Sequence, residues 1–598
     1  MCGIVGFKGK NYNGIEVLIK GLESLEYRGY DSAGISYIKN GKINTIKEKG
    51  KLKQLKLKID KKESTSLGIA HTRWATHGEA NRTNAHPHTC ENITLVHNGI
   101  IENYQSLKED LVKKGYKFKS ETDTEVIAVL LNDIYKKKKD MLVSIQELVD
   151  KLKGSYALAI LVKGDDKLYA VRNKSPLILG IKDNNYFLAS DIPAILAYTK
   201  DYCILEDKDI VIIDDNYQII NDKKKVQREV LTYQGSLEDV LKGGYAHYML
   251  KEIHEQPTII QNLLSLYLNE DKSNFSDKCP DLSKYKKIHI VGCGSAYHTG
   301  LVAKSLFEEY AHVETLVEVA SEYRYKENFY DKNTLVIVIS QSGETADTLA
   351  SLEKAKNDHI DTLAIVNRED SSIARMADTT LYIQAGIEVA VATTKAYSAQ
   401  VMLLAILALK YAYDHNRLSE KDLKNYLAPA KDMKKLIEKE LKNTEKISFI
   451  RKVSKRKDIF FIGRKIDYAL SMEGSLKLKE ISYINAVSYQ AGELKHGTIS
   501  LIEKGTPVFA IITDDDIYDK TISNIKEVKA RGAYVVCITN TKVGKDCYDE
   551  IIKVEKTNKF FQALISIIPL QVIAYETAKS LGCDIDKPRN LAKSVTVE

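Results

Sequence analysis

Short apolar runs separated by glycine, asparagine and charged residues fill about the first 220 residues. The runs read CGIVGF, SLGIAHTRWATHG, ITLVHNG and YALAILV, and a helical spacing covers Thr124 to Tyr135. Apolar runs this short, bounded by turn residues, are typical of β-strands. The pattern therefore predicts a β-rich domain over residues 2–220, with helices between some of its strands.

A polar segment, NDKKKVQREV, interrupts this pattern from Asn221 onward. It is followed by GGYAHYMLKEIHEQP, in which Gly243, Gly244 and Pro257 are residues that commonly end regular structure. We predict a linker with hinge character over residues 221–260.

From about Lys287 the order of apolar and polar residues changes. KIHIVGCGSAYHTG and NTLVIVISQSGETADTLASLEKAK both run as an apolar strand, a small-residue turn and a helix. The same order returns in DIFFIGRKIDYALSMEGSLKLKE, so that Ile288 and Ile459 begin corresponding strands about 170 residues apart. We predict two parallel α/β domains, at 279–418 and 450–588, related by internal duplication, with a C-terminal tail at 589–598.

Composition narrows the class of protein. The 598 residues are too many for one hydrophobic core, and a net charge of +7 from 88 basic and 81 acidic residues does not indicate nucleic acid binding. Eight dispersed cysteines without a CxxC pair argue against zinc and disulfides and favour a reducing compartment. Apolar stretches such as Val401 to Leu409 are too short to span a bilayer. We expect a cytoplasmic protein without metal, membrane or nucleic acid partners.

The opening MCGIVGFKG places a cysteine at position 2. Cys2 could be a small buried hydrophobic residue. Alternatively, removal of Met1 would leave Cys2 with a thiol and a free α-amine on the same residue. Such a thiol can attack a carboxamide carbon, and an α-amine with a pKa of about 7.7 to 8.0 can act as its base.

Other segments of the first domain suit amide chemistry. Asn98-Gly99 reads as a hairpin turn when taken alone, yet an asparagine amide and a glycine N–H also make a pair of oxyanion donors. Arg73 could bind a substrate carboxylate and Asp123 an ammonium group. The five histidines between positions 71 and 97 lack the cysteine or carboxylate spacing of a metal site.

The stretch VIVISQSGETADT predicts an anion site. Hydroxyls and backbone N–H groups at a helix N-terminus, after a parallel strand, favour a phosphate monoester. The segment has no lysine and is therefore not a nucleotide P-loop. The competing interpretation is a helix cap alone. VGCGSAYHTG and VAVATTKAY predict two further turns of this kind, and the second domain lacks the serine-rich loop.

The segment MEGSLKLKEISY predicts a helix with three charged residues on one face. Glu473, Lys477 and Glu480 lie at i, i+4 and i+7. An exposed salt-bridge ladder is the plain interpretation. With His496 nearby in the sequence, the set also suits proton transfer next to a carbonyl. Lys593, six residues from the end, reads as part of a solvated tail when taken alone.

Together, CGIVGF, YRGYDSAG, HTRWATHG, VHNGIIEN and SETDTE resemble the glutaminase domain of amidotransferases with an N-terminal nucleophile. Over nearly its whole length the chain resembles the isomerizing glutamine–fructose-6-phosphate aminotransferase family. The resemblance implies an αββα type-2 glutaminase domain followed by two parallel-sheet αβα sugar-isomerase domains. It also implies an enzyme that makes glucosamine 6-phosphate from fructose 6-phosphate and glutamine, without a cofactor, as a homodimer through its isomerase domains. A glutaminase serving another sugar phosphate and a catalytically silent sugar-phosphate sensor remain the rival hypotheses.

The resemblance also assigns roles to residues of the glutaminase domain. Cys2 is the nucleophile, and Asn98 and Gly99 form the oxyanion hole. Arg28 organises the nearby loop and Trp74 gates ammonia. The residues expected to hold glutamine are Arg73, Thr76, His77 and Asp123.

In the isomerase domains the resemblance makes Lys593 the Schiff base, Glu480 the base at C1 with Lys477 and Glu473 assisting, and His496 the ring-opening residue from a neighbouring subunit. Ala296 stands where the family has a second hydroxyl, so one sugar contact is missing. The remaining expected ligands are Ser340, Gln341, Ser342 and Thr345 for the phosphate and Ser295, Val391, Ala392, Thr393 and Ala592 for the sugar.

Overall fold

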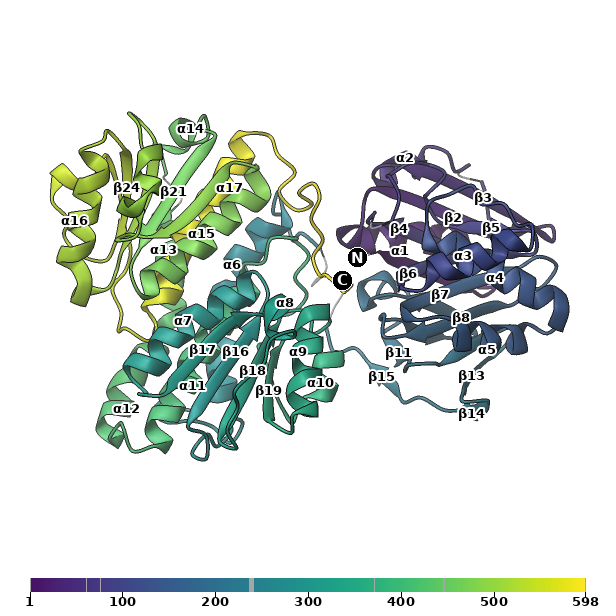
Figure 1. Cartoon of the computed structure of the whole chain (residues 1–598), viewed down its shortest axis with the longest axis horizontal. Helices are drawn as coiled ribbons and strands as arrows, with labels where there is room; N and C mark the ends of the chain where they lie inside the picture. The colour runs from purple at the N-terminus through teal and green to yellow at the C-terminus, as the bar shows by residue number, and fades with distance from the viewer. Residues whose placement is uncertain are drawn as a thin grey trace. The chain divides into compact units, whose positions relative to one another are not determined.

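Antiparallel and parallel sheets lie in different parts of the chain (Figure 1). The computed structural model describes residues 2–60, 62–75, 77–235, 241–369, 371–444 and 447–596. It divides into a first unit, residues 1–241 with 592–598, and a second unit, residues 242–591.

Two antiparallel sheets make up the first unit. In spatial order, the first contains β15 (Val230–Thr232), β11 (Asp201–Ile204), β9 (Ile178–Lys182), β10 (Asn185–Ala189), β1 (Gly3–Lys8), β4 (Leu67–Arg73), β2 (Ser32–Lys39) and β3 (Lys42–Lys49). The second contains β14 (Lys224–Val226), β13 (Tyr217–Asn221), β12 (Ile210–Ile213), β8 (Leu168–Asn173), β7 (Gly154–Val162), β6 (Ile93–Ile101) and β5 (His88–Cys90).

Strand β7 shows how these sheets are layered with helices. Its residues Leu158 and Ile160 pack with the helix-side core, whereas Ala159 and Leu161 pack in the core between the sheets. Because side chains alternate along a strand, burial on both faces produces the continuous apolar run YALAILV. Helices α4 (Asp123–Lys138) and α5 (Met141–Lys151) cover the second sheet, and α1 (Gly14–Leu25) covers the first. This arrangement confirms the αββα prediction; α2 (Leu52–Lys56) and α3 (Tyr104–Lys113) complete the named helices of this unit.

Two five-stranded parallel sheets make up the second unit, and they share one topology. The orders are β17 (Glu314–Val319), β16 (Lys287–Gly292), β18 (Thr334–Ser340), β19 (Asp361–Val366), β20 (Thr379–Tyr382) and β22 (Asn485–Gln490), β21 (Asp458–Gly463), β23 (Pro507–Ile512), β24 (Tyr534–Thr539), β25 (Glu550–Lys553). The first strands begin at residues 287 and 458, a difference of 171. The predicted repeat is confirmed.

Helices on both faces of the sheets complete the second unit. The helix after the first strand of each repeat, α7 (Ser295–Glu309) or α15 (Ile466–Ser482), packs against its counterpart. Among the described residues α11 (Lys395–Asp414) is the one helix long and apolar enough to cross a membrane, and 89% of its most apolar window is buried in the fold. The others are α6 (Tyr248–Tyr267), α8 (Ala320–Tyr323), α9 (Ala346–Asn357), α10 (Ser372–Met376), α12 (Glu420–Leu427), α13 (Met433–Thr444), α14 (Ile450–Val453), α16 (Tyr518–Lys529) and α17 (Gln562–Ser580).

Pro257 does not end regular structure as its place in the predicted hinge suggested. It lies inside the 20-residue helix α6. A proline removes one helical hydrogen bond, which costs about 3 kcal/mol in an isolated helix. Ile253, Ile260 and Leu264 of the same helix are fully buried in the core of the second unit, so packing outweighs that local cost.

Candidate active sites

The thiol of Cys2 is held by the backbone at the end of β4. Trp74 N donates to Cys2 Sγ at 3.3 Å, and the thiol faces Trp74 O at 3.6 Å. The pairing of β1 with β4 brings these residues together, since Gly3 is opposite Thr72. Burial raises the pKa of the Cys2 thiol. A thiol protonated at neutral pH needs a base before it can act as a nucleophile.

The carbonyl oxygen of Cys2 is fixed by two predicted site residues. Arg28 Nε donates to it at 3.2 Å and Asn98 Nδ2 at 3.0 Å. Arg28 is itself held by Asp191, whose Oδ2 lies 3.1 Å from Arg28 Nη1 and 2.7 Å from Tyr27 OH. Asp191 could not be predicted from the sequence, because a single aspartate after a strand is part of no recognisable motif.

Asn98 lies inside strand β6, so the hairpin-turn interpretation of Asn98-Gly99 is wrong. Its Nδ2 also donates to Ser190 Oγ at 2.8 Å, and its Oδ1 accepts from His71 Nε2 at 3.1 Å. Both amide hydrogens are therefore engaged, one with Cys2 and one with Ser190. To stabilise an oxyanion, Asn98 must exchange one of these bonds. Ser190 was missed in the sequence analysis.

His71 sets the orientation of the Asn98 amide. Its Nε2 faces two acceptors, Asn98 Oδ1 and His97 O at 3.0 Å, so that nitrogen carries the proton. Burial lowers the pKa of His71 to about 3, which keeps the ring neutral. The ring stacks on His86 with centroids 4.1 Å apart. No group of three or more His, Cys, Asp or Glu side chains within the described ranges has the arrangement of a metal site.

The backbone at Gly99 leaves no room for a side chain. Its φ is +126°, and a Cβ there would collide with the carbonyl oxygen of Ser155 on β7. Only glycine accommodates both conditions. The backbone N–H after Asn98 is thereby held in a fixed place beside the Asn98 side chain.

The predicted glutamine ligands lie around the same strand ends. The Arg73 side chain is buried and donates to Glu79 O at 3.3 Å, Gly78 O at 3.2 Å and His77 O. Asp123 begins α4, and its Oδ2 accepts from Ile101 N at 3.0 Å. Thr76 lies outside the described residues. Arg73 is thus tied to the loop that carries the predicted ligand His77.

In the second unit, the predicted sugar-phosphate turns meet at one sheet edge. β16 and β18 are parallel neighbours. After β16 the chain forms β17 on one side of it and then crosses to form β18 on the other side. Ser295 follows β16 and Ser340 ends β18. In open α/β sheets such a reversal of strand order opens a crevice at the carboxyl ends, where ligands bind.

The loop from Ser340 to Thr345 is organised by its own hydroxyls. Ser340 Oγ lies 2.9 Å from Thr345 Oγ1 and accepts from Gly343 N at 3.0 Å, and Glu344 N donates to Ser342 Oγ at 3.2 Å. Gly343 has φ +66°, and a Cβ there would collide with the Ser371 side chain. Helix α9 begins directly after the loop. Its first backbone N–H groups and these hydroxyls are therefore together at a helix N-terminus, which is a position that favours an anion.

The charged helix face of α15 is buried, so the exposed-ladder interpretation is wrong. Glu473 and Lys477 have side-chain exposures of 0% and 1%, whereas Glu480 is 20% exposed. Lys477 Nζ lies 2.6 Å from Glu480 Oε2 and 3.5 Å from Glu473 Oε1. Glu473 also accepts from Ser295 Oγ at 2.8 Å and from His298 Nδ1 at 2.8 Å. One continuous line thus runs from α7 of the first repeat to α15 of the second.

The charges along this line stabilise one another. Burial opposes the charge of Glu473, but Lys477 and His298 outweigh it and lower the pKa of Glu473. Burial likewise opposes the charge of Lys477, but Glu480 and Glu473 outweigh it and raise the pKa of Lys477. Buried charges persist only when paired in this way. Glu480 is the member of the line that reaches solvent, and His298 was missed in the sequence analysis.

The other predicted sugar ligands contact residues outside the Glu473–Lys477–Glu480 line. Val391 N donates to Asp586 O at 3.0 Å, Ala392 is buried and Thr393 Oγ1 donates to Glu388. His496 is exposed at the end of a short 3-10 helix (Leu494–His496). Ala592 and Lys593 belong to the C-terminal segment that groups with the first unit, and their roles stay predictions.

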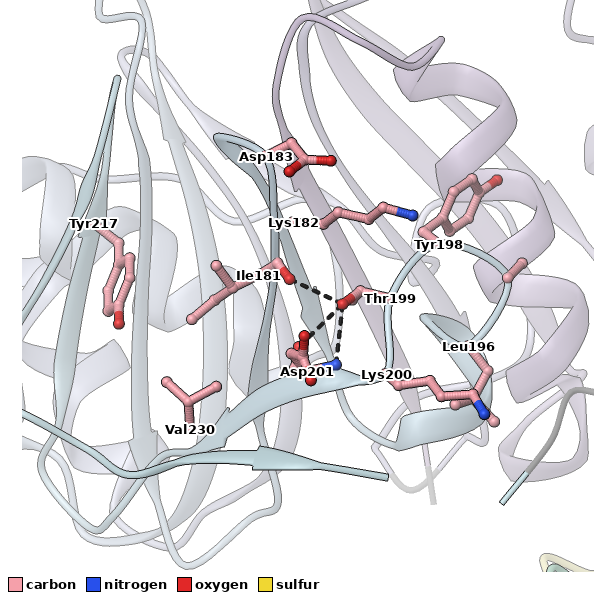
Figure 2. A pocket seen from close by; sticks show the side chains of 11 residues that line it. Ile181, Lys182, Asp183, Leu196, Tyr198, Thr199, Lys200, Asp201, Tyr217 and Val230 are labelled. Atoms are coloured by element: carbon pink, nitrogen blue, oxygen red, sulfur yellow. Dashed lines mark hydrogen bonds between the residues drawn. The ribbon is translucent and has the colours of Figure 1, made fainter. Parts of the chain in front are cut away.

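A cavity of about 750 Å³ in the first unit is unrelated to these residues (Figure 2). It is lined by the loop of residues 196–201 and by parts of β9, β13 and β15. Figure 2 shows Thr199 among the lining residues, and its hydroxyl donates to Ile181 O at 2.9 Å and accepts from Asp201 N at 3.0 Å. None of the predicted site residues lines it.

Comparison with known proteins covers both units. The glutamine amidotransferase domain family matches residues 71–197, and the SIS domain family matches residues 281–410 and 452–580. Proteins named glutamine--fructose-6-phosphate aminotransferase [isomerizing] from Clostridium tetani and Methanosarcina acetivorans are 46% and 43% identical, each over 100% of both chains. A solved C-terminal domain of glucosamine-fructose-6-phosphate aminotransferase from Francisella tularensis is 37% identical, with a TM-score of 0.55 over 58% of this chain and 99% of that chain.

Proposed function

This chain belongs to the isomerizing glutamine–fructose-6-phosphate aminotransferase family, and we propose which of its residues carry out each step of the family's reaction. The enzyme converts fructose 6-phosphate and glutamine to glucosamine 6-phosphate and glutamate. The observation that carries the proposal is the buried Glu473–Lys477–Glu480 line, which is bonded to Ser295 of the first repeat. In the same chain, the thiol and the carbonyl oxygen of Cys2 are both held by hydrogen bonds.

Glutamine is hydrolysed at Cys2. With Met1 removed, the α-amine takes the thiol proton while Sγ attacks the carboxamide carbon. The tetrahedral intermediate collapses to a thioester and releases ammonia, and water then releases glutamate. Asn98 and Gly99 stabilise the oxyanion. Arg73 binds the substrate carboxylate and Asp123 its ammonium group, with Thr76 and His77 closing the site.

Trp74 connects hydrolysis to ammonia transfer. Its backbone makes both hydrogen bonds to Cys2 Sγ, so a change at the nucleophile reaches the indole side chain through one residue. We assign Trp74 the gating of ammonia, and Arg28 the positioning of Cys2 through its carbonyl.

Amination and isomerisation use the second unit and the C-terminal segment. Ser340, Gln341, Ser342 and Thr345 bind the phosphate, and Lys593 forms an imine with the C2 carbonyl, releasing water. Ammonia displaces Lys593 from that imine. Glu480 then removes a proton from C1 to give an enolamine, and C2 is protonated. The C2 imine thereby becomes the amine and the C1 hydroxyl becomes the aldehyde, without a further hydrolysis.

The remaining sugar contacts come from the turns around this loop. We further propose that exposed His496 opens the sugar ring in the site of a neighbouring subunit. The proposal includes a homodimer that acts in the cytoplasm. The sugar ligands in this proposal are Ser295, Val391, Ala392, Thr393 and Ala592.

A product assay tests the proposal as a whole. Purified protein with fructose 6-phosphate should form glucosamine 6-phosphate when glutamine is present and almost none when it is absent. Glutamine hydrolysis that accelerates with a different sugar phosphate would favour the first rival hypothesis. Sugar-phosphate binding without any hydrolysis would favour a sensor.

Asn98→Ala is expected to lower kcat for glutamine hydrolysis about 10² to 10³-fold while KM changes little, since the amide serves the oxyanion and not the ground-state carboxamide. Steady-state kinetics measure both values. Ser190→Ala is the matched control, because it removes the other partner of Asn98 Nδ2 without removing the donor. A raised KM with unchanged kcat would make Asn98 a substrate clamp.

His298→Ala is expected to slow glucosamine 6-phosphate synthesis about tenfold. The substitution leaves one oxygen of buried Glu473 without its hydrogen-bond donor, and such a loss costs roughly 1–3 kcal/mol of free energy. His298 acts through Glu473 and is a positioning residue. His298→Asn, which keeps a donor, should restore most of the rate. Glutamine hydrolysis should not change. Equal loss in both variants, or a loss of hydrolysis, would indicate a general folding defect instead.

A further inference from the structure

The second repeat has its own crevice, equivalent to the sugar-phosphate site of the first. Corresponding strand positions are Ile290 and Phe461, which differ by 171, and their cross-strand partners Ile337 and Phe509, which differ by 172. With these offsets, residues 477 and 480 of α15 correspond to residues 306 and 309 of α7. Leu306 and Glu309 therefore stand where the first site has Lys477 and Glu480.

A cavity of about 260 Å³ lies at this equivalent edge. Leu306 and Glu309 line it, together with Ile466 after β21, Asp514 after β23 and Asn540 after β24. A cavity of this volume has room for several water molecules or for a small ligand. The position is that of a ligand crevice in an open α/β sheet.

The loop of this crevice no longer suits a phosphate. Residue 342 corresponds to residue 514 with the offset of 172, so Ser342 is replaced by Asp514, and two further aspartates follow. Asp515 is paired with Lys556 at 2.6 Å, and Asp516 is paired with Lys559. Asp514 Oδ1 accepts from Asp516 N at 3.0 Å, but Asp514 makes no ion pair with any residue that the structure describes. Lys556 and Lys559 also line the crevice, and each is paired with its own aspartate, so the charge of Asp514 disfavours an anion and favours a cation.

Two buried oxygen atoms of lining residues have no hydrogen-bond partner among the described residues. Asn540 Nδ2 donates to Thr513 O at 3.1 Å, which identifies the other atom of that amide as the carbonyl oxygen. This Oδ1 is buried and has no hydrogen-bond partner among the described residues, and the same holds for Thr557 Oγ1, another lining residue. Buried polar atoms without partners are rare, and a ligand rich in N–H and O–H groups would satisfy them.

From these features we propose that the crevice of the second repeat binds a small hydroxylated primary amine without a phosphate group, of the class of free amino sugars. The ammonium group pairs with Asp514, and hydroxyls meet Asn540 and Thr557. Leu306 in place of Lys477 leaves no relay for proton transfer, so the site binds and does not react. The lining of this crevice does not depend on the function of the first crevice, but the experiment below rests on the proposed binding of fructose 6-phosphate there.

Free glucosamine is the probe, and isothermal titration calorimetry of the full-length protein measures it. Fructose 6-phosphate at saturation, with no glutamine added, keeps the probe out of the first crevice. We expect one glucosamine per chain under these conditions, with glucose and glucosamine 6-phosphate each binding at least tenfold more weakly. Asp514→Asn should weaken glucosamine binding at least tenfold, because it removes the charge and keeps the shape.

Asp519→Asn, which removes an exposed carboxylate on nearby α16, is the matched control and should bind the probe normally. Synthesis of glucosamine 6-phosphate should be unchanged in Asp514→Asn, which also shows that the variant is folded. Three results would each overturn the proposal: no heat of binding at millimolar glucosamine, complete displacement by fructose 6-phosphate, or equal affinity in wild type and Asp514→Asn.

Discussion

Cys2→Ala is expected to abolish glutamine hydrolysis and glutamine-dependent synthesis. The α-amine base survives this change, but no atom remains that can attack the carboxamide carbon. Coupled detection of glutamate and of glucosamine 6-phosphate measures both losses. Because burial raises the pKa of the Cys2 thiol, the rate of glutamine hydrolysis by the wild type should increase as pH rises and more thiolate forms.

The matched control is Cys203→Ala, at a buried cysteine on β11 of the same unit. It should leave hydrolysis largely intact. In Cys2→Ala the binding of fructose 6-phosphate should be unchanged, because the phosphate loop belongs to the second unit. Loss of sugar-phosphate binding in this variant would contradict separate sites.

Lys593→Arg is expected to eliminate synthesis while glutamine hydrolysis stays measurable. Arginine keeps the positive charge, but its delocalised guanidinium does not form an imine under ordinary conditions. Borohydride added with fructose 6-phosphate should reduce the imine of the wild type to a stable amine. Mass spectrometry should then locate the added mass on the C-terminal peptide, and the variant should show none.

Lys587→Arg is the control, because it changes another lysine of the same C-terminal stretch. It should retain both trapping and synthesis. If trapping persists in Lys593→Arg, the imine forms on another lysine. Lys477, buried between Glu473 and Glu480, would be the first to test.

The sequence allowed the architecture to be predicted wherever a pattern was repeated or continuous. The runs before Ser340 and at Ala157 to Val162 are apolar because both faces of those strands are buried, and that signal survives without a structure. The prediction at Pro257 was wrong, because the rule that proline ends a helix considers only the hydrogen bond lost within that helix. Only the tertiary packing of α6 reveals that the cost is exceeded.

The residues of the candidate sites also fall into two groups, those that belong to a sequence motif and those that do not. Cys2, Asn98 and the serine loop stand in motifs, and each could be named from its neighbours in the sequence. Ser190 and Asp191 orient Asn98 and Arg28 from more than 90 residues away, and His298 holds Glu473 from another repeat. Such partners are single common residues whose meaning comes from the fold.

The contact of Ser295 and His298 with Glu473 has an evolutionary consequence. In the proposed centre, the binding loop comes from one copy of the duplicated fold, and the helix that carries Glu473 and Glu480 comes from the other. Two identical copies joined in this way would hold two equal centres, as a symmetric dimer does. Once covalently tethered, each copy was free to specialise, and each half became indispensable to the other. A gene that encodes either half alone would therefore lack part of the proposed centre and part of the core that the two repeats share.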